Sequence, residues 1–156
     1  MTDREIVNLF EQNHPSSLEQ MQALGLNPVY IAHGGNRQVY RLGQSLVVKI
    51  GREYEGKYLQ TVNEIRAIQK IHQSPRLEKY HKHVLPLFYG NAETGIIVTK
   101  YYPGEVKASD EGKFQNLMDS LQSIGVQDLF YANFRQDADG TLVAIDLGFY
   151  TDEEEL

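Results

Sequence analysis

The first 25 residues contain hydrophobic positions at helical spacing, in two groups that a proline separates. The first group is Ile6, Leu9 and Phe10, and the second is Leu18, Met21 and Leu24. Residues 14–17 lie between the groups and include Pro15, which favours a turn. This pattern predicts two short helices, with Ser16 or Ser17 as the N-cap of the second helix and Gly25 at its end.

The next part of the chain has the hydrophobic pattern of β-strands. Three short runs, at residues 29–32, 38–42 and 45–50, are rich in β-branched, aromatic and other apolar residues. Glycine-containing turns separate the runs at residues 33–36 and 43–44. We therefore expect an antiparallel meander of three strands.

The rest of the chain alternates between helical and strand-like patterns. Hydrophobic residues at helical spacing predict a long helix over residues 55–73, and a polar connection follows it up to His83. The further predicted elements are strands at 84–89 and 95–101, a helix at 110–124, a strand near 133–135, a turn at 137–140 and a strand at 141–145.

The composition excludes several classes of protein. With 156 residues, 41% of them hydrophobic, the chain has room for one compact domain with a sizeable core. Its 15 basic and 21 acidic residues give a net charge of −6, so no general positive field attracts nucleic acid. The absence of cysteine excludes disulfides, thiolate metal sites and a cysteine nucleophile. No membrane span or signal peptide is recognisable in the pattern, so we expect a cytoplasmic protein.

Several polar and glycine residues indicate a function only when their order along the chain is considered. Taken singly, Gly34 and Gly35 predict a hairpin turn, and Glu64 predicts an exposed helix position. Lys49 lies in an otherwise apolar strand, where a lysine either reaches solvent at an edge or meets an anion. Later in the chain come Asp128, Asn133 and Asp146. In this order, such residues are typical of a site for nucleotide phosphates and a metal ion.

Between residues 29 and 150 the chain resembles the protein-kinase-like superfamily. Lys49 matches the strand lysine of the V-A-I-K motif, and Glu64 matches its ion-pair partner on the following helix. Asp128 and Asn133 match the catalytic loop, in which the aspartate stands five positions before the asparagine. The D-F-G motif of the family is matched by Asp146, Leu147 and Gly148.

The resemblance implies an α+β fold of the protein-kinase type. Residues 28–105 are then an N-lobe that contains a five-stranded antiparallel sheet and one long helix. Residues 1–27 are a helical extension that precedes this lobe. Residues 106–156 are then a truncated C-lobe with one helix and the catalytic and metal-binding loops.

The resemblance also implies roles for the matching residues. Lys49 is expected to bind the α- and β-phosphates of ATP and to be held by Glu64. Asn133 and Asp146 are expected to supply oxygen ligands to Mg²⁺. Asp128 is expected to orient the attacking hydroxyl and to accept its proton.

Two further segments correspond to nucleotide-binding parts of the family. The turn that contains Gly34 and Gly35 is expected to offer backbone N–H groups to the phosphates. Tyr101 and Tyr102 stand where the family joins its lobes and binds adenine through backbone hydrogen bonds.

The chain departs from the family at several positions. Ala32 and Arg37 occupy two of the family's loop-glycine positions, and Phe130 stands where protein kinases commonly carry a lysine. Residues 126–127 replace the His-Arg pair before the catalytic aspartate. Because the sequence ends eight residues after Gly148, we expect no activation segment and none of the large helices that dock peptide substrates.

Two functions are consistent with these matches and departures. The first is a minimal kinase, similar to reduced bacterial kinases, that uses ATP and Mg²⁺ to phosphorylate a hydroxyl of a protein or a small molecule. The alternative is a pseudokinase or regulatory module that binds a protein partner, which could also replace the missing part of the C-lobe. Under either function, the expected location of the protein is the cytoplasm, or a host cell if the protein is a delivered effector.

Three other features have simple structural explanations. His81 and His83 alternate in a polar connection, but no third metal ligand lies nearby in sequence. Asp137 and Asp139 match part of a calcium loop whose terminal glutamate is missing, so a hairpin turn is expected. The acidic residues 151–156 are expected to form a solvated tail.

Overall fold

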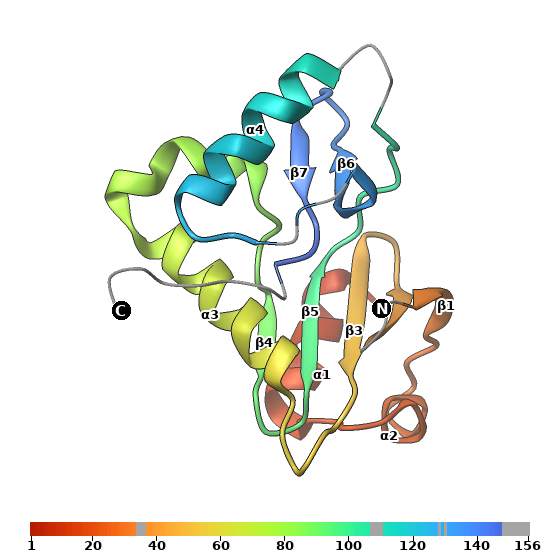
Figure 1. Cartoon of the computed structure of the whole chain (residues 1–156). Coiled ribbons are helices and arrows are strands. Elements are labelled where there is room, and N and C mark those ends of the chain that lie inside the picture. The colour runs from red at the N-terminus through yellow and green to blue at the C-terminus, as the bar shows by residue number, and fades with distance from the viewer. Residues whose placement is uncertain (34–36, 107–110, 128, 130, 148–156) are drawn as a thin grey trace. The chain divides into compact units, whose positions relative to one another are not determined.

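The structure is a computed structural model that describes residues 1–33, 37–106, 111–127, 129 and 131–147 (Figure 1). The chain divides into two compact units. The first unit comprises Met1–Ile65 and Pro86–Tyr101, and the second comprises Arg66–Leu85 and Tyr102–Leu156. The fold is of the mixed α+β class, as predicted. The lobe boundaries after residues 27 and 105, which rest on the family resemblance, stay a prediction.

The first unit is built on the predicted five-stranded antiparallel sheet. Figure 1 shows its central strands side by side, and the full order is β1-β2-β3-β5-β4. The strands are β1 (Val29–His33), β2 (Arg37–Leu42), β3 (Leu46–Gly51), β4 (Tyr89–Asn91) and β5 (Ile96–Lys100). Four consecutive residues are buried in each of β3 and β5, which shows that both faces of these strands are covered.

Strand β4 begins five residues later than the hydrophobic pattern predicts. Val84 and Leu85 pair instead with Ala144, and all three of these residues belong to the second unit. Val84 forms a parallel bridge with Ala144, and the N–H of Leu85 donates to the carbonyl oxygen of Ala144 at 3.1 Å. The strand predicted over 84–89 is therefore wrong for residues 84–88, because alternation alone does not identify the strand with which such a run pairs.

Both N-terminal helices form where the hydrophobic spacing predicts them. They are α1 (Asp3–Asn13) and α2 (Leu18–Ala23). Thr2 caps α1, because its hydroxyl accepts the N–H of Glu5 at 3.2 Å while the Glu5 carboxylate accepts the N–H of Thr2 at 3.3 Å. Ser17 caps α2 by accepting the N–H of Gln20 at 3.2 Å. Gly25 follows α2 with a φ of +85°, a left-handed conformation typical of helix ends.

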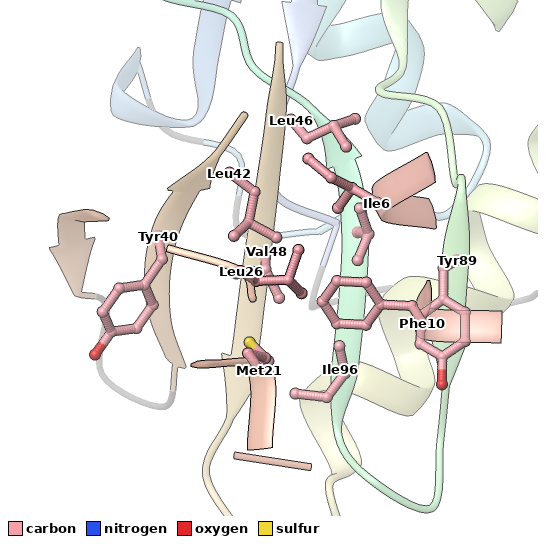
Figure 2. Packing of buried hydrophobic residues seen from close by; sticks show 11 residues of the cluster. Ile6, Phe10, Met21, Leu26, Tyr40, Leu42, Leu46, Val48, Tyr89 and Ile96 are labelled. Atoms are coloured by element: carbon pink, nitrogen blue, oxygen red, sulfur yellow. The ribbon is translucent and has the colours of Figure 1, made fainter. Parts of the chain in front are cut away.

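These two helices share a hydrophobic core with one face of the sheet. Figure 2 shows the Phe10 side chain close to Tyr89, and their ring centroids are 5.4 Å apart. The α1 and α2 helices therefore help to build the first unit. The buried members of this core are Ile6, Phe10, Met21, Leu26, Tyr40, Leu42, Leu46, Val48, Tyr89, Ile96 and Val98.

Helix α3 (Leu59–Gln73) begins four residues later than predicted. Glu55 and Gly56 precede it with φ values of +52° and +78°, which a right-handed helix does not contain. Tyr54 and Lys57 pair across this turn as an antiparallel bridge. The left-handed turn therefore sets the start of α3.

Two glycines allow the first part of α3, up to Ile65, to approach the sheet closely. A Cβ atom at Gly51 would overlap the side chain of Thr61 on α3. A Cβ atom at Gly95 would overlap the ring of Tyr58, and the φ of Gly95 is +73°. These positions therefore require glycine for a steric reason, and at Gly95 also for a conformational one.

The variant Gly51→Ala is expected to lower the free energy of unfolding by about 1–2 kcal/mol, because the added methyl group pushes Thr61 and α3 away from the sheet. Urea unfolding measures this change. Gly112→Ala in helix α4 is a control without a clash, since a Cβ atom at that position meets no atom within 4 Å, and it should leave stability equal or raise it by up to about 1 kcal/mol. Equal stability of Gly51→Ala and the wild type would show that the close approach is not needed.

Among its described residues, the second unit contains the rest of α3, a further helix, 3₁₀ segments and a hairpin. These elements are η1 (Pro75–His83), α4 (Glu111–Ser123), η3 (Tyr131–Asn133), β6 (Phe134–Gln136) and β7 (Leu142–Ala144). The expected polar connection thus forms 3₁₀ turns on either side of a kink at Leu77, and it buries Leu77 and Tyr80. Phe114 and Phe134 pack edge to face with ring centroids 4.8 Å apart.

Asp137 forms the predicted hairpin turn between β6 and β7. Its carboxylate accepts the N–H of Asp139 at 3.1 Å and the N–H of Thr141 at 3.0 Å. Within the described ranges no three histidine or acidic side chains gather as a possible metal site. The same part of the chain holds no helix that is both long enough and apolar enough to cross a membrane.

Candidate functional site

Strand register places two basic residues on one face of the sheet in the first unit. Lys49 on β3 lies opposite Val39 on β2, and Arg37 lies opposite Gly51. Residues directly opposite each other in an antiparallel pair point to the same face, and so do residues two positions apart. Arg37 and Lys49 therefore point to the face that α3 covers, away from the N-terminal helices.

Glu64 on α3 meets both basic side chains. The Lys49 Nζ atom and the Arg37 Nη1 atom each lie 2.7 Å from Glu64 Oε1. The Arg37 Nη2 atom lies 3.4 Å from Glu64 Oε2. The exposed fractions of Glu64, Lys49 and Arg37 are 0%, 5% and 6%, so the whole cluster is buried. We call these three residues the buried ion triad.

The charges of the triad determine the protonation of Glu64. Burial by itself raises the pKa of this carboxyl, because a protein interior solvates a charge poorly. The positive charges of Arg37 and Lys49, and the hydrogen bonds that they donate, more than offset burial and lower the pKa from 4.5 to about 2. Glu64 is therefore ionised at neutral pH.

The contact between Lys49 and Glu64 that the family resemblance implies is thus present. In the family resemblance, by contrast, Arg37 is only a replacement for a loop glycine. The alternation of β2 could have indicated its place, because residues 37 and 39 share the face of Lys49. Nothing in the sequence pattern indicates that its side chain reaches Glu64.

Asn133 and Asp146 lie in neighbouring segments of the second unit. The N–H of Ile145 donates to the carbonyl oxygen of Asn133 at 2.8 Å, just beyond the β6–β7 pairing. Both Asn133 and Asp146 are half-buried. Amide and carboxylate oxygens are ligands that Mg²⁺ accepts, so the chemistry of this pair fits the expected metal.

The two tyrosines expected near adenine belong to different units. Tyr101 ends the first unit, where its N–H donates to the Ser45 carbonyl oxygen at 2.7 Å and the Arg41 guanidinium lies 4.8 Å from its ring centroid. Tyr102 begins the second segment of the second unit, where burial, and then the charge of Asp137, raise the pKa of its hydroxyl. Their role in nucleotide binding stays a prediction.

Four of the predicted positions lie outside the described residues. They are Gly34, Gly35, Asp128 and Gly148. Phe130, a departure from the family, lies outside them as well. The proposed contributions of these positions therefore rest on the sequence.

His81 and His83, the other candidate metal ligands, have separate surroundings in the second unit. His83 Nδ1 lies 2.8 Å from the carbonyl oxygen of Leu142, so this nitrogen carries the proton. The ring of His81 instead lies beside the ring of His72, with centroids 5.4 Å apart. A hydrogen bond thus accounts for His83, whereas the buried Nε2 atom of His81 has no hydrogen-bond partner among the described residues.

Comparisons with known proteins give little information about the family. No family model matches the sequence, and no curated protein matches it. A solved structure with detectable similarity is the bifunctional kinase-methyltransferase WbdD, with 16% sequence identity and a TM-score of 0.47. The match covers 78% of this chain and 31% of that chain, so this chain spans about a third of the length of that protein.

Proposed function

We propose that this protein is an ATP- and Mg²⁺-dependent phosphotransferase of the protein-kinase-like type. The observation that carries the proposal is the buried contact of 2.7 Å between Lys49 and Glu64. A lysine on a central strand rarely lies in the interior unless an anion requires it, because burial of an ammonium group is costly. The order of Lys49, Glu64, Asp128, Asn133 and Asp146 along the chain also supports the proposal.

In this proposal each residue has one task. Lys49 binds phosphate oxygens of the nucleotide, and Glu64 holds the lysine in place. Asn133 and Asp146 hold the magnesium ion, which neutralises phosphate charge when it is bound. Asp128 accepts the proton of the acceptor hydroxyl while the hydroxyl oxygen bonds to the γ-phosphorus. The bond between the γ-phosphorus and the β-phosphate oxygen breaks at the same time and releases ADP.

Binding of MgATP is expected to stabilise the folded protein. At a free concentration about one hundred times the dissociation constant, a ligand adds about 2.7 kcal/mol, which raises the melting temperature by several degrees. Differential scanning fluorimetry with ATP, with and without Mg²⁺, measures this shift. An unchanged melting temperature in millimolar MgATP would contradict the nucleotide site.

Variants separate the parts of the proposal. Lys49→Met is expected to reduce the rise in melting temperature that MgATP causes, whereas Lys57→Met, at an exposed position of the same unit, is a matched control.

Asp128→Asn is expected to retain MgATP binding and to lose transfer of label from γ-labelled ATP to the protein, to water or to proteins of a cell extract. Wild-type protein that binds MgATP but transfers no more label than Asp128→Asn would be a pseudokinase.

A further inference from the structure

Two cations of the buried ion triad share one carboxylate oxygen. Arg37 Nη1 and Lys49 Nζ each lie 2.7 Å from Glu64 Oε1, and Arg37 Nη2 also lies 3.4 Å from Oε2. All three residues are more than nine-tenths buried. Arg37 therefore spans the carboxylate of Glu64, whereas Lys49 contacts one of its oxygens.

The two cations differ in how freely their hydrogen-bond donors can reorient. The guanidinium of Arg37 is a rigid, planar group that stays charged and matches both oxygens of a carboxylate. The ammonium of Lys49 carries three rotatable donors on a flexible stem. If an anion approaches, Lys49 can turn donors toward it while Arg37 keeps its place on Glu64.

Binding of phosphate by Lys49 raises a physical problem that Arg37 can solve. A buried carboxylate that loses part of its ion pairing takes up a proton more readily, because burial favours the neutral form. A protonated Glu64 would hold Lys49 less firmly. A second cation on the same carboxylate removes this difficulty.

We propose that Arg37 is a positioning residue of the nucleotide site, which keeps Glu64 ionised and in place while Lys49 turns its donors to the nucleotide phosphates. This inference rests on the proposed function. It gives Arg37 an indirect role through Glu64, without direct contact to the nucleotide.

The test uses proton uptake, which a purely structural role of Arg37 would not change. MgATP is titrated into the full-length protein by calorimetry at several pH values between 5 and 8, in buffers of different ionisation enthalpy. The nucleotide contributes the same protons to every titration, so the difference between a variant and the wild type reports the protein. The variants are Arg37→Met, Arg37→Gln and Arg37→Lys, with the exposed Arg4→Met as a control in the same unit.

We expect Arg37→Met to take up additional protons when MgATP binds, up to one per nucleotide at the lower pH values. At pH values above the pKa of Glu64 in the complex, its affinity for MgATP should fall by about ten-fold relative to the wild type for each unit by which MgATP binding raises that pKa, and proton uptake should offset part of this loss at lower pH. Arg37→Lys, which retains the charge, should restore most of the affinity and abolish the extra proton uptake. Circular dichroism verifies folding, and Arg37→Gln replaces Arg37→Met if the latter does not fold.

Each other outcome decides against the inference in a different way. If the uncharged Arg37 variant matches the wild type in affinity and in proton uptake, Arg37 does not position Glu64. If the affinity falls equally at every pH, without proton uptake and without rescue by lysine, Arg37 contacts the phosphates directly. If the wild type itself does not bind MgATP, the proposed function is wrong and the inference fails with it.

Discussion

Replacement of Glu64 by glutamine is expected to lower the free energy of unfolding by about 3–5 kcal/mol, which is the usual cost of removing one partner from a buried ion pair. Arg37 and Lys49 are both at least 94% buried and both contact the same carboxylate oxygen. Without the carboxylate charge, the two cations repel each other in a poorly solvated interior. Urea unfolding at pH 7, followed by circular dichroism, measures the loss.

The exposed Glu93 supplies the control for this substitution. Glu93→Gln, in the turn between β4 and β5, makes the same chemical change at the surface of the same unit and should alter stability by less than about 0.5 kcal/mol. A Glu64→Gln protein as stable as Glu93→Gln would mean that the cations of the triad do not depend on Glu64. That result would also remove the basis for a positioning role of Arg37.

Acid is expected to remove the same stabilisation from the wild-type protein. The pKa of Glu64 is lowered from 4.5 to about 2 in the folded state. The ionised carboxylate therefore stabilises the fold at every pH above its pKa in the unfolded state. This contribution, about 3 kcal/mol, is complete above about pH 5 and is lost as the pH falls through 4.5 toward 2. The stability difference between the wild type and Glu64→Gln should therefore be constant from pH 6 to 8 and shrink below pH 5.

A comparison at each pH isolates Glu64 from the other carboxylates. Asp139, for example, also has a pKa lowered to about 2, by hydrogen bonds that involve first Asp137 and then Thr141. Because both proteins contain Asp139, its titration cancels in the difference between them. A difference that stays constant down to pH 2.5 would show that Glu64 is not the group that titrates.

The sheet and the helices could be predicted from the sequence because their signals are local. The alternation at residues 38–42 and the spacing of Ile6 and Phe10 each reflect one buried face. The segment with which each strand pairs was harder to predict from the sequence. Val84 and Leu85, for example, pair with Ala144, which lies about 60 residues away in sequence. Likewise, the start of α3 depends on a left-handed turn at Glu55 and Gly56, and Glu55, as a non-glycine residue, gives no sequence signal for its part of this turn.

The candidate site could be predicted only in part for a related reason. Lys49 and Glu64 were paired by their order along the chain and by the family resemblance. Arg37 was missed because its contact with Glu64 depends on how α3 lies on the sheet, which Gly51 and Gly95 permit. Periodicity shows which face a residue is on, but it does not give the distance between a strand and a helix.

The position of β5 within the sheet has a consequence for how the first unit folds. Strand β5 lies between β3 and β4, yet more than 40 residues separate it from β3 along the chain. The meander of β1, β2 and β3 can form early from local contacts, whereas the pairing of β3 with β5 must first close this long loop. During synthesis, β3 therefore stays an open edge until residues 96–100 leave the ribosome, and this edge is where the nascent chain is most exposed to aggregation.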